Sequence, residues 1–125
     1  MELSQEITSI LLDAEAKALA SASKNDVNVV PVSSVKVVEN EIWLINYFFD
    51  KTLYNIQQNP NVALTFWKGL KGYQIKAETK YITEGNKFKK ATDWISEIHP
   101  NRIVKGLLVL DTVDVFDISI DNKRI

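Results

Sequence analysis

The feature that most constrains the fold is the stretch of residues 27–38, which is β-branched at most of its positions. β-branched side chains favour extended backbone, so this stretch predicts one long strand. A turn at Glu39 and Asn40, followed by an apolar run over residues 41–46, predicts a hairpin. Other apolar stretches are also linked by short turns. The chain therefore favours antiparallel pairing over the alternating β–α–β order of a parallel sheet.

The remaining strand and helix patterns extend this prediction. Further strands are expected over residues 17–23, 62–68, 73–83 and 105–119, which makes six in all. Helices are expected over residues 4–15, from Thr52 as N-cap to Gln58, and along residues 88–98 ahead of Pro100. We therefore predict a mainly β, α+β fold: a small six-stranded antiparallel barrel, closed or partly open. It would have an N-terminal helix, a short helix after the third strand and a helix before the last strand.

Length and composition exclude several classes of protein. The 125 residues fit a single domain over positions 1–125. Because the sequence has 15 basic and 16 acidic residues, it has no excess of positive charge that would favour a nucleic-acid partner. Cys is absent and His99 is the one histidine, which rules out disulfides, thiolate metal sites and multi-histidine metal sites. No apolar run could span a membrane and no export signal is visible, so we expect a cytoplasmic protein.

Catalytic motifs are sparse in this sequence. The glycines at positions 69, 72, 85 and 106 form neither a dinucleotide-binding nor a phosphate-binding loop. Ser33 and Ser34 have no neighbouring histidine that would indicate a serine nucleophile. If the protein is an enzyme, a cofactor would have to supply the reactivity.

Lys51 and Thr52 form the most informative pair, because they stand at the start of the expected short helix. A helix N-terminus presents free backbone N–H groups and the positive end of the helix dipole. A lysine and a hydroxyl beside these groups make a compact phosphate site. The alternative is that Thr52 only caps the helix while Lys51 is solvated.

Four ordered segments carry a resemblance to a known family: 28–34 (NVVPVSS), 42–46 (IWLIN), 51–64 (KTLYNIQQNPNVAL) and 72–77 (GYQIKA). Their order resembles the pyridoxamine 5′-phosphate oxidase-like, FMN-binding split-barrel family, and within it the small, predicted flavin-nucleotide-binding branch. The resemblance implies a split barrel that forms a homodimer with FMN at the subunit interface.

The resemblance also implies which residues contact the flavin. Lys51 and Thr52 would hold the FMN phosphate, at a place where the family often has two basic residues. Part of strand 27–38 would line the isoalloxazine, although a one-residue slip would swap the faces of that strand. The implied contacts are Val30, Val32, Ser33, Ser34, Ile45, Asn46, Lys51 and Thr52, with Gly72, Tyr73 and Gln74 from the second subunit.

Aromatic residues near this region have two interpretations. Phe48, Trp67 and Tyr73 could border a substrate pocket, or they could be core or dimer-interface anchors. Only Lys123 and Arg124 supply positive charge beyond the last expected strand. In the true oxidases of the family that the chain resembles, a segment beyond the last strand brings basic and histidine residues to the substrate. The resemblance therefore implies small neutral or apolar acceptors here, and no efficient oxidation of pyridoxine or pyridoxamine phosphate.

The function implied by the resemblance is that of an FMN-dependent oxidoreductase or reductase acting on an unknown small molecule. Two alternatives stay open: a non-enzymatic flavin binder or electron carrier, and a relative that uses deazaflavin F420. The sequence names neither the substrate nor the electron donor, which could be NADH, NADPH or another compound.

Overall fold

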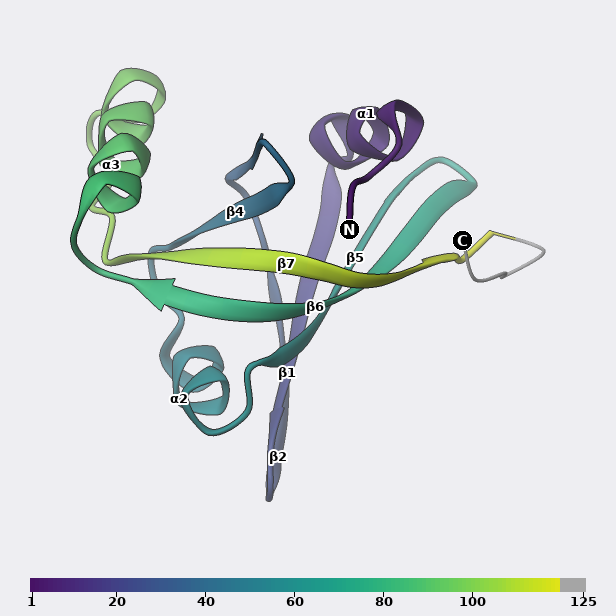
Figure 1. Cartoon of the computed structure of the whole chain (residues 1–125), viewed down its shortest axis with the longest axis horizontal. Coiled ribbons are helices and arrows are strands. Elements are labelled where there is room, and N and C mark those ends of the chain that lie inside the picture. Colours follow the sequence, from purple (N-terminus) through teal and green to yellow (C-terminus); the bar gives the residue numbers. More distant parts are fainter. Residues whose placement is uncertain (120–125) are drawn as a thin grey trace.

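The computed structural model describes residues 1–119, which form one antiparallel sheet flanked by three helices (Figure 1). The helices are α1 (Gln5–Asp13), α2 (Asp50–Gln58) and α3 (Asn86–Ile98). The strands are β1 (Ala16–Ser23), β2 (Asp26–Pro31), β3 (Val35–Val38), β4 (Glu41–Asn46), β5 (Asn61–Lys68), β6 (Lys71–Ile82) and β7 (Gly106–Asp117). The mainly β, α+β class, the antiparallel pairing and the three helices are confirmed.

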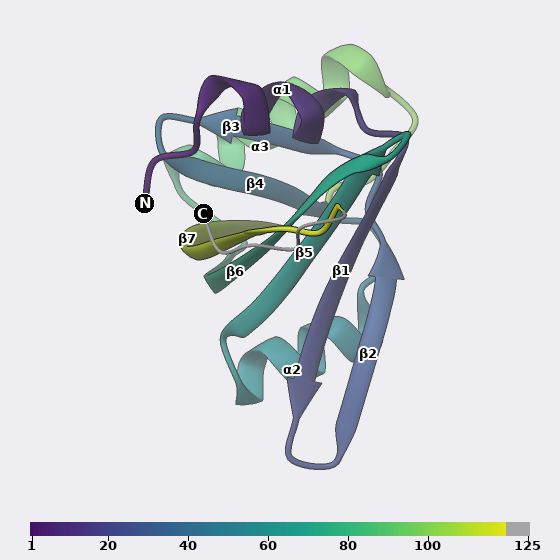
Figure 2. The same ribbon diagram turned by 90° about the vertical axis from the view of Figure 1, so that its right-hand side faces the viewer.

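The prediction of six strands was wrong, because residues 27–38 form two strands instead of one. In the sheet order β2-β1-β5-β6-β7-β4-β3, the two pieces lie at opposite edges. Figure 2 shows β2 beside β1, and β3 beside β4. Pro31 ends β2, because it has no N–H to donate to a neighbouring strand. The next amide, that of Val32, still donates to the Lys17 carbonyl of β1 at 3.0 Å, and the chain then leaves this edge of the sheet. The short helix α2 accordingly follows the fourth strand and not the third.

The sheet described over residues 1–119 is open, so the prediction of a barrel holds only in its partly open form. No ladder joins the edge strands β2 and β3 within this part of the chain. Residues 32–34, here called the β2–β3 link, carry the chain from one edge to the other. This link forms part of one wall of a pocket.

The main core lies between α1 and the concave side of the sheet. Ile7 and Leu11 of α1 pack with Leu19, Leu64 and other buried strand residues. The Ser4 hydroxyl accepts a hydrogen bond from the Ile7 amide at 3.2 Å, which caps α1 as expected. This capped helix packs against β5 and the edge strand β3.

A second, smaller core lies on the other face of β4 and β7. There Ala91 and Ile95 of α3 pack against Trp43 and Ile45 of β4 and their neighbours on β7. Alternate residues of β4, such as Leu44, point into the main core instead. Burial on both faces holds β4 rigidly, and with it the chain segment that follows.

Helix α2 is held against β1 and β2 by polar contacts as well as by Ile56. The Asn28 amide donates to the Thr52 hydroxyl at 2.9 Å, and the Asn55 amide donates to the Ser21 hydroxyl at 3.3 Å. The expected N-cap at Thr52 was wrong: α2 begins at Asp50, and Thr52 lies fully buried in its first turn. The hydroxyl of Thr52 is oriented toward β2.

Across residues 1–119, none of the helices has both the length and the apolar character needed to cross a membrane.

Candidate functional site

A pocket of about 1050 Å³, here called the main pocket, opens between three segments of the chain. One wall is the end of β2 with the β2–β3 link, and the second is the end of β4 with residues 47–49. The third is the loop over residues 99–105 that follows α3, while the start of β1 completes the lining. This volume lies just above the ~300–1,000 Å³ typical of small-molecule sites.

Four flavin contacts implied by the family resemblance, Val30, Val32, Ser33 and Ile45, meet in this pocket together with Phe48, which was expected at a substrate pocket. Val32 and Ile45 are largely buried and form an apolar floor. Ser33 and Phe48 are exposed, and Phe48 is 85% accessible. The pocket therefore combines a fixed apolar base with an open rim.

Asn46 lies just behind this pocket and connects two of its walls. Its side-chain oxygen accepts a hydrogen bond from the Phe49 amide at 2.6 Å, and its amide donates to the Tyr81 hydroxyl at 2.9 Å. The Lys105 amide in turn donates to the Asn46 carbonyl at 3.0 Å. Only 3% of Asn46 is exposed, so within one chain both ends of its side chain are used to hold the protein together.

Ser34 is also buried, and its hydroxyl lies 2.8 Å from the Tyr47 hydroxyl. This contact ties the β2–β3 link to the segment after β4. In this chain Ser34 orients the ring of Tyr47, which lines the main pocket.

The start of α2 follows the pocket wall directly, because Phe49 lines the pocket and α2 begins at Asp50. Lys51 is exposed, whereas the Thr52 side chain is buried against Asn28. Among residues 1–119, no hydrogen bond is found for the backbone N–H groups of Lys51 and Thr52. The helix start can therefore offer an anion two amides and one lysine, but not the Thr52 hydroxyl.

The segment Gly72, Tyr73 and Gln74 lies at the β5–β6 hairpin, outside the main pocket. Tyr73 is 3% exposed and packs on Phe66 with the ring centroids 6.1 Å apart. Trp67 is 43% exposed but does not line the pocket either. A single chain thus does not bring these residues to the other predicted contacts.

A charged cluster surrounds that hairpin. Lys71 Nζ lies 3.3 Å from an Asp117 carboxylate oxygen and 5.3 Å from the centre of the Tyr73 ring. The Tyr73 side chain and Asp117 raise the pKa of Lys71, while hydrogen bonds from Ser119 lower the pKa of Asp117. Both groups keep their charge near neutral pH, and their ion pair links β6 to β7.

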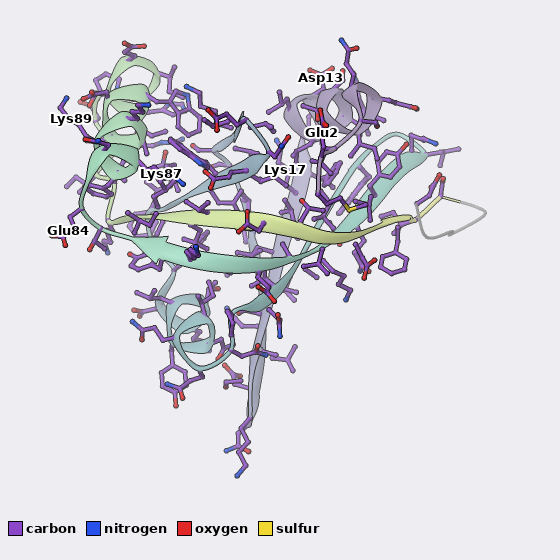
Figure 3. The ribbon with its side chains drawn as sticks, in the orientation of Figure 1. Glu2, Asp13, Lys17, Glu84, Lys87 and Lys89 are labelled. Atoms are coloured by element: carbon purple, nitrogen blue, oxygen red, sulfur yellow. The ribbon has the colours of Figure 1, made fainter. Side chains whose placement is uncertain are left out.

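Sequence reasoning assigned no role to three cations that line the main pocket: Lys17, Arg102 and Lys105. Arg102 lies over the Tyr47 ring at 5.2 Å, and Lys105 lies over the Phe48 ring at 5.4 Å. Lys17 donates to the Ala14 carbonyl at the end of α1, near which it is drawn in Figure 3. Arg102 and Lys105, two cations in the short loop after Pro100, could have indicated a site in the sequence. They were missed because this loop is far in sequence from residues 30–49, which form the other walls of the pocket.

Comparisons with known proteins agree with this architecture. The model of the pyridoxamine 5′-phosphate oxidase family matches residues 3–122. The uncharacterized protein MJ0282 of Methanocaldococcus jannaschii is 32% identical over 114 residues, which are 86% of this chain and 76% of that protein.

Solved structures share the fold at low sequence identity. HupZ of Group A Streptococcus superposes with a TM-score of 0.86 at 17% identity, covering 98% of both chains. An FMN-binding protein of Syntrophomonas wolfei gives 0.79 at 18% identity, covering 91% of this chain and 84% of that one. Since the family model spans nearly the whole sequence, the chain belongs to the pyridoxamine 5′-phosphate oxidase family.

Proposed function

We propose that the protein is an FMN-binding flavoprotein whose main pocket takes the flavin ring, with the phosphate at the start of α2. The proposal rests on one observation: the wall of the main pocket leads directly into the start of α2. Phe49 lines the pocket, and the free amides of Lys51 and Thr52 follow within the first turn of α2. The similar fold of a protein named as FMN-binding supports the same cofactor.

The residues of the pocket fit a planar, partly apolar ring with a polar edge. Val30, Val32 and Ile45 offer apolar surface, and Tyr47 and Phe48 offer aromatic rings. Ser33 and Ser34 of the β2–β3 link lie outside any strand, so their backbone polar groups can pair with a ligand. For the phosphate, a helix N-terminus with one lysine is a favourable anion site.

When bound, FMN would supply hydride or electron transfer. The chain itself would bind and orient the ring, and the walls tied together by Asn46 would limit the access of water. We propose an oxidoreductase role on this basis, without assigning a catalytic residue. The visible spectrum and mass of the copurifying small molecule would separate FMN from deazaflavin. Turnover with NADH or NADPH would separate an enzyme from a carrier.

Replacing Lys51 by Ala should weaken FMN binding roughly 10–100-fold and leave riboflavin binding almost unchanged, since a charge-assisted hydrogen bond contributes about 1.5–3 kcal/mol. Fluorescence titration of both ligands measures the difference. Lys90→Ala is the matched control, because Lys90 is an exposed lysine on α3. An equal loss for both ligands would show that Lys51 does not meet the phosphate.

We further propose that the protein is a homodimer, as the family resemblance implies. Large apolar side chains are exposed on the single chain: Val27 and Val29 on β2, Val113 on β7, and Trp67 and Leu70 near the β5–β6 hairpin. A stable interface of over ~2,000 Å² would cover many of them. Sedimentation at micromolar concentration should give twice the chain mass of 14.2 kDa. A flavin-loaded species at the mass of one chain would contradict the dimer.

A further inference from the structure

We infer that Lys17, assisted by Arg102 and Lys105, favours the reduced state of a flavin ring in the main pocket and so raises the reduction potential of that ring. The inference deepens the proposed function, on which it rests, because it assigns control of the flavin's redox equilibrium to side chains of this chain. It concerns the ring and not the phosphate, which the proposed function assigns to the start of α2.

The charge of a flavin ring depends on its oxidation state. Reduction by an external donor adds two electrons and one proton to the neutral ring, and above neutral pH the product carries one negative charge. A positive side chain beside the ring therefore binds the reduced form more tightly than the oxidised form. Through linkage, each tenfold difference between the two affinities changes the potential of a two-electron couple by about 30 mV. The phosphate has the same charge in both states, so a lysine that contacts only the phosphate leaves the potential unchanged.

The first observation is the positive charge of the pocket lining. Lys17, Arg102 and Lys105 line the pocket, and among the described lining residues Glu15 supplies the one carboxylate. The ion pairs found within residues 1–119 involve other lysines, on β5, β6 and α3. The lining therefore keeps a net positive charge, although the whole chain has a net charge of −1.

The second observation is the position of Lys17, the cation best placed to act on the ring. Lys17 is half-buried, whereas Arg102 and Lys105 are exposed. Its ammonium group donates to the carbonyl of Ala14, the residue that follows α1, and a carbonyl orients a cation without cancelling its charge. The backbone carbonyl of Lys17 accepts from the Val32 amide at 3.0 Å, which puts Lys17 beside the apolar floor of the pocket. A partly buried charge is screened less than an exposed one, so Lys17 should carry most of the effect.

The third observation is how the two cations of the loop after α3 are held at the rim. Arg102 lies 5.2 Å from the centre of the Tyr47 ring, and Lys105 lies 5.4 Å from the centre of the Phe48 ring. Both rings line the same pocket, and an aromatic ring orients a cation while leaving its charge in place. Because water and salt reach these two exposed side chains, their contribution should be smaller than that of Lys17.

The two basic residues considered beyond the last expected strand, Lys123 and Arg124, lie outside the described residues and take no part in this inference. The expectation of small neutral or apolar acceptors depends on that segment. So does the expected poor oxidation of pyridoxine or pyridoxamine phosphate, and both stay predictions.

The test measures the reduction potential of bound FMN by stepwise reduction with dithionite against a reference dye, above neutral pH and with the protein in excess. Lys17→Gln removes the charge and keeps a donor for the Ala14 carbonyl. We expect it to weaken the binding of reduced FMN, relative to oxidised FMN, at least ~10-fold, which lowers the potential by about 30 mV. An effect of this size is the smallest that is usual for an opposite charge within about 4–6 Å. Lys90→Gln, on the exposed side of α3, is the matched control and should leave the potential within ~10 mV.

Arg102→Gln combined with Lys105→Gln is the second variant, because both residues are exposed. At low salt it should lower the potential by about 20 mV, which corresponds to a roughly fivefold change in the affinity ratio. Thermal melting shows which variants are folded, and this double variant decides if Lys17→Gln does not fold.

A potential within ~10 mV of that of the unmodified protein, in either folded variant, would overturn the inference, and so would an equal fall in Lys90→Gln. If the unmodified protein does not bind FMN, the proposed function fails and the inference fails with it. If FMN binds and its potential ignores these substitutions, the inference fails alone.

Discussion

Replacing Ser33 by Trp should lower the affinity for FMN roughly 100-fold or more while leaving the fold intact. Ser33 is exposed, stands in the β2–β3 link outside any ladder, and lines the main pocket. The indole would occupy space that the flavin ring needs, and no buried group would be lost. Fluorescence titration with FMN gives the affinity, and circular dichroism with thermal melting reports on the fold.

Ser96→Trp is the matched control, because Ser96 is an exposed serine on α3 outside the pocket. It should bind FMN as the unmodified protein does. If Ser33→Trp bound FMN within about threefold of the unmodified protein, the ring would have to lie elsewhere, since binding in this pocket could not tolerate the added indole.

Replacing Gly106 by Ala should destabilise the protein by about 2–3 kcal/mol. A Cβ at this position would lie 2.0 Å from the Tyr81 hydroxyl and 2.2 Å from Cζ of the ring. The Tyr81 ring would have to swing away, which breaks its hydrogen bond with Asn46 and leaves a buried amide without a partner. Denaturant unfolding measures the loss, which should appear as a lower midpoint at constant slope.

A double-mutant cycle identifies the cause of this effect. In a Tyr81→Ala background the added methyl group has room, so Gly106→Ala should cost less than about 0.5 kcal/mol. Tyr81→Phe should give no such relief, because the clash involves ring carbons as well as the hydroxyl. Costs that simply add across the Tyr81→Ala cycle would argue against the contact. Tyr81 also donates to the carbonyl of Lys105, which lines the main pocket, at 3.4 Å. Because Gly106→Ala displaces Tyr81 from this wall of the pocket, it should weaken FMN binding as well.

Local sequence patterns predicted the segments of regular structure well, and the reason is physical. The expected strands at residues 17–23 and 62–68 and the Ser4-capped helix correspond closely to β1, β5 and α1. Side-chain branching, apolar spacing and capping act over a few residues, so they can be read from the sequence without knowledge of the fold. The family resemblance came from the order of the same segments, and the family itself is confirmed over residues 3–122.

The partners of those segments were decided only by tertiary structure. Residues 27–38 are β-branched at most positions and favour strands, but propensity does not say which strand supplies the hydrogen bonds. In the fold the first part pairs with β1 and the last part with β4, which turned the predicted single strand into β2 and β3. Thr52 shows the same limit: its place at a helix start was predicted, while its burial against Asn28 depends on how α2 packs on β2.

The main pocket marks the same division between sequence and structure. Val30, Val32, Ser33 and Ile45 could be assigned to a flavin site because they lie in segments whose order resembles the family. Lys17, Arg102 and Lys105 could not, because they come from the start of β1 and the loop after α3 and share no local pattern with those segments. The loop that carries Arg102 and Lys105 reaches the pocket because the sheet brings the end of β4 beside the start of β7, where the Lys105 amide donates to the Asn46 carbonyl. Local chemistry thus determined what each segment becomes, and the long-range pairing of strands decided which charges meet.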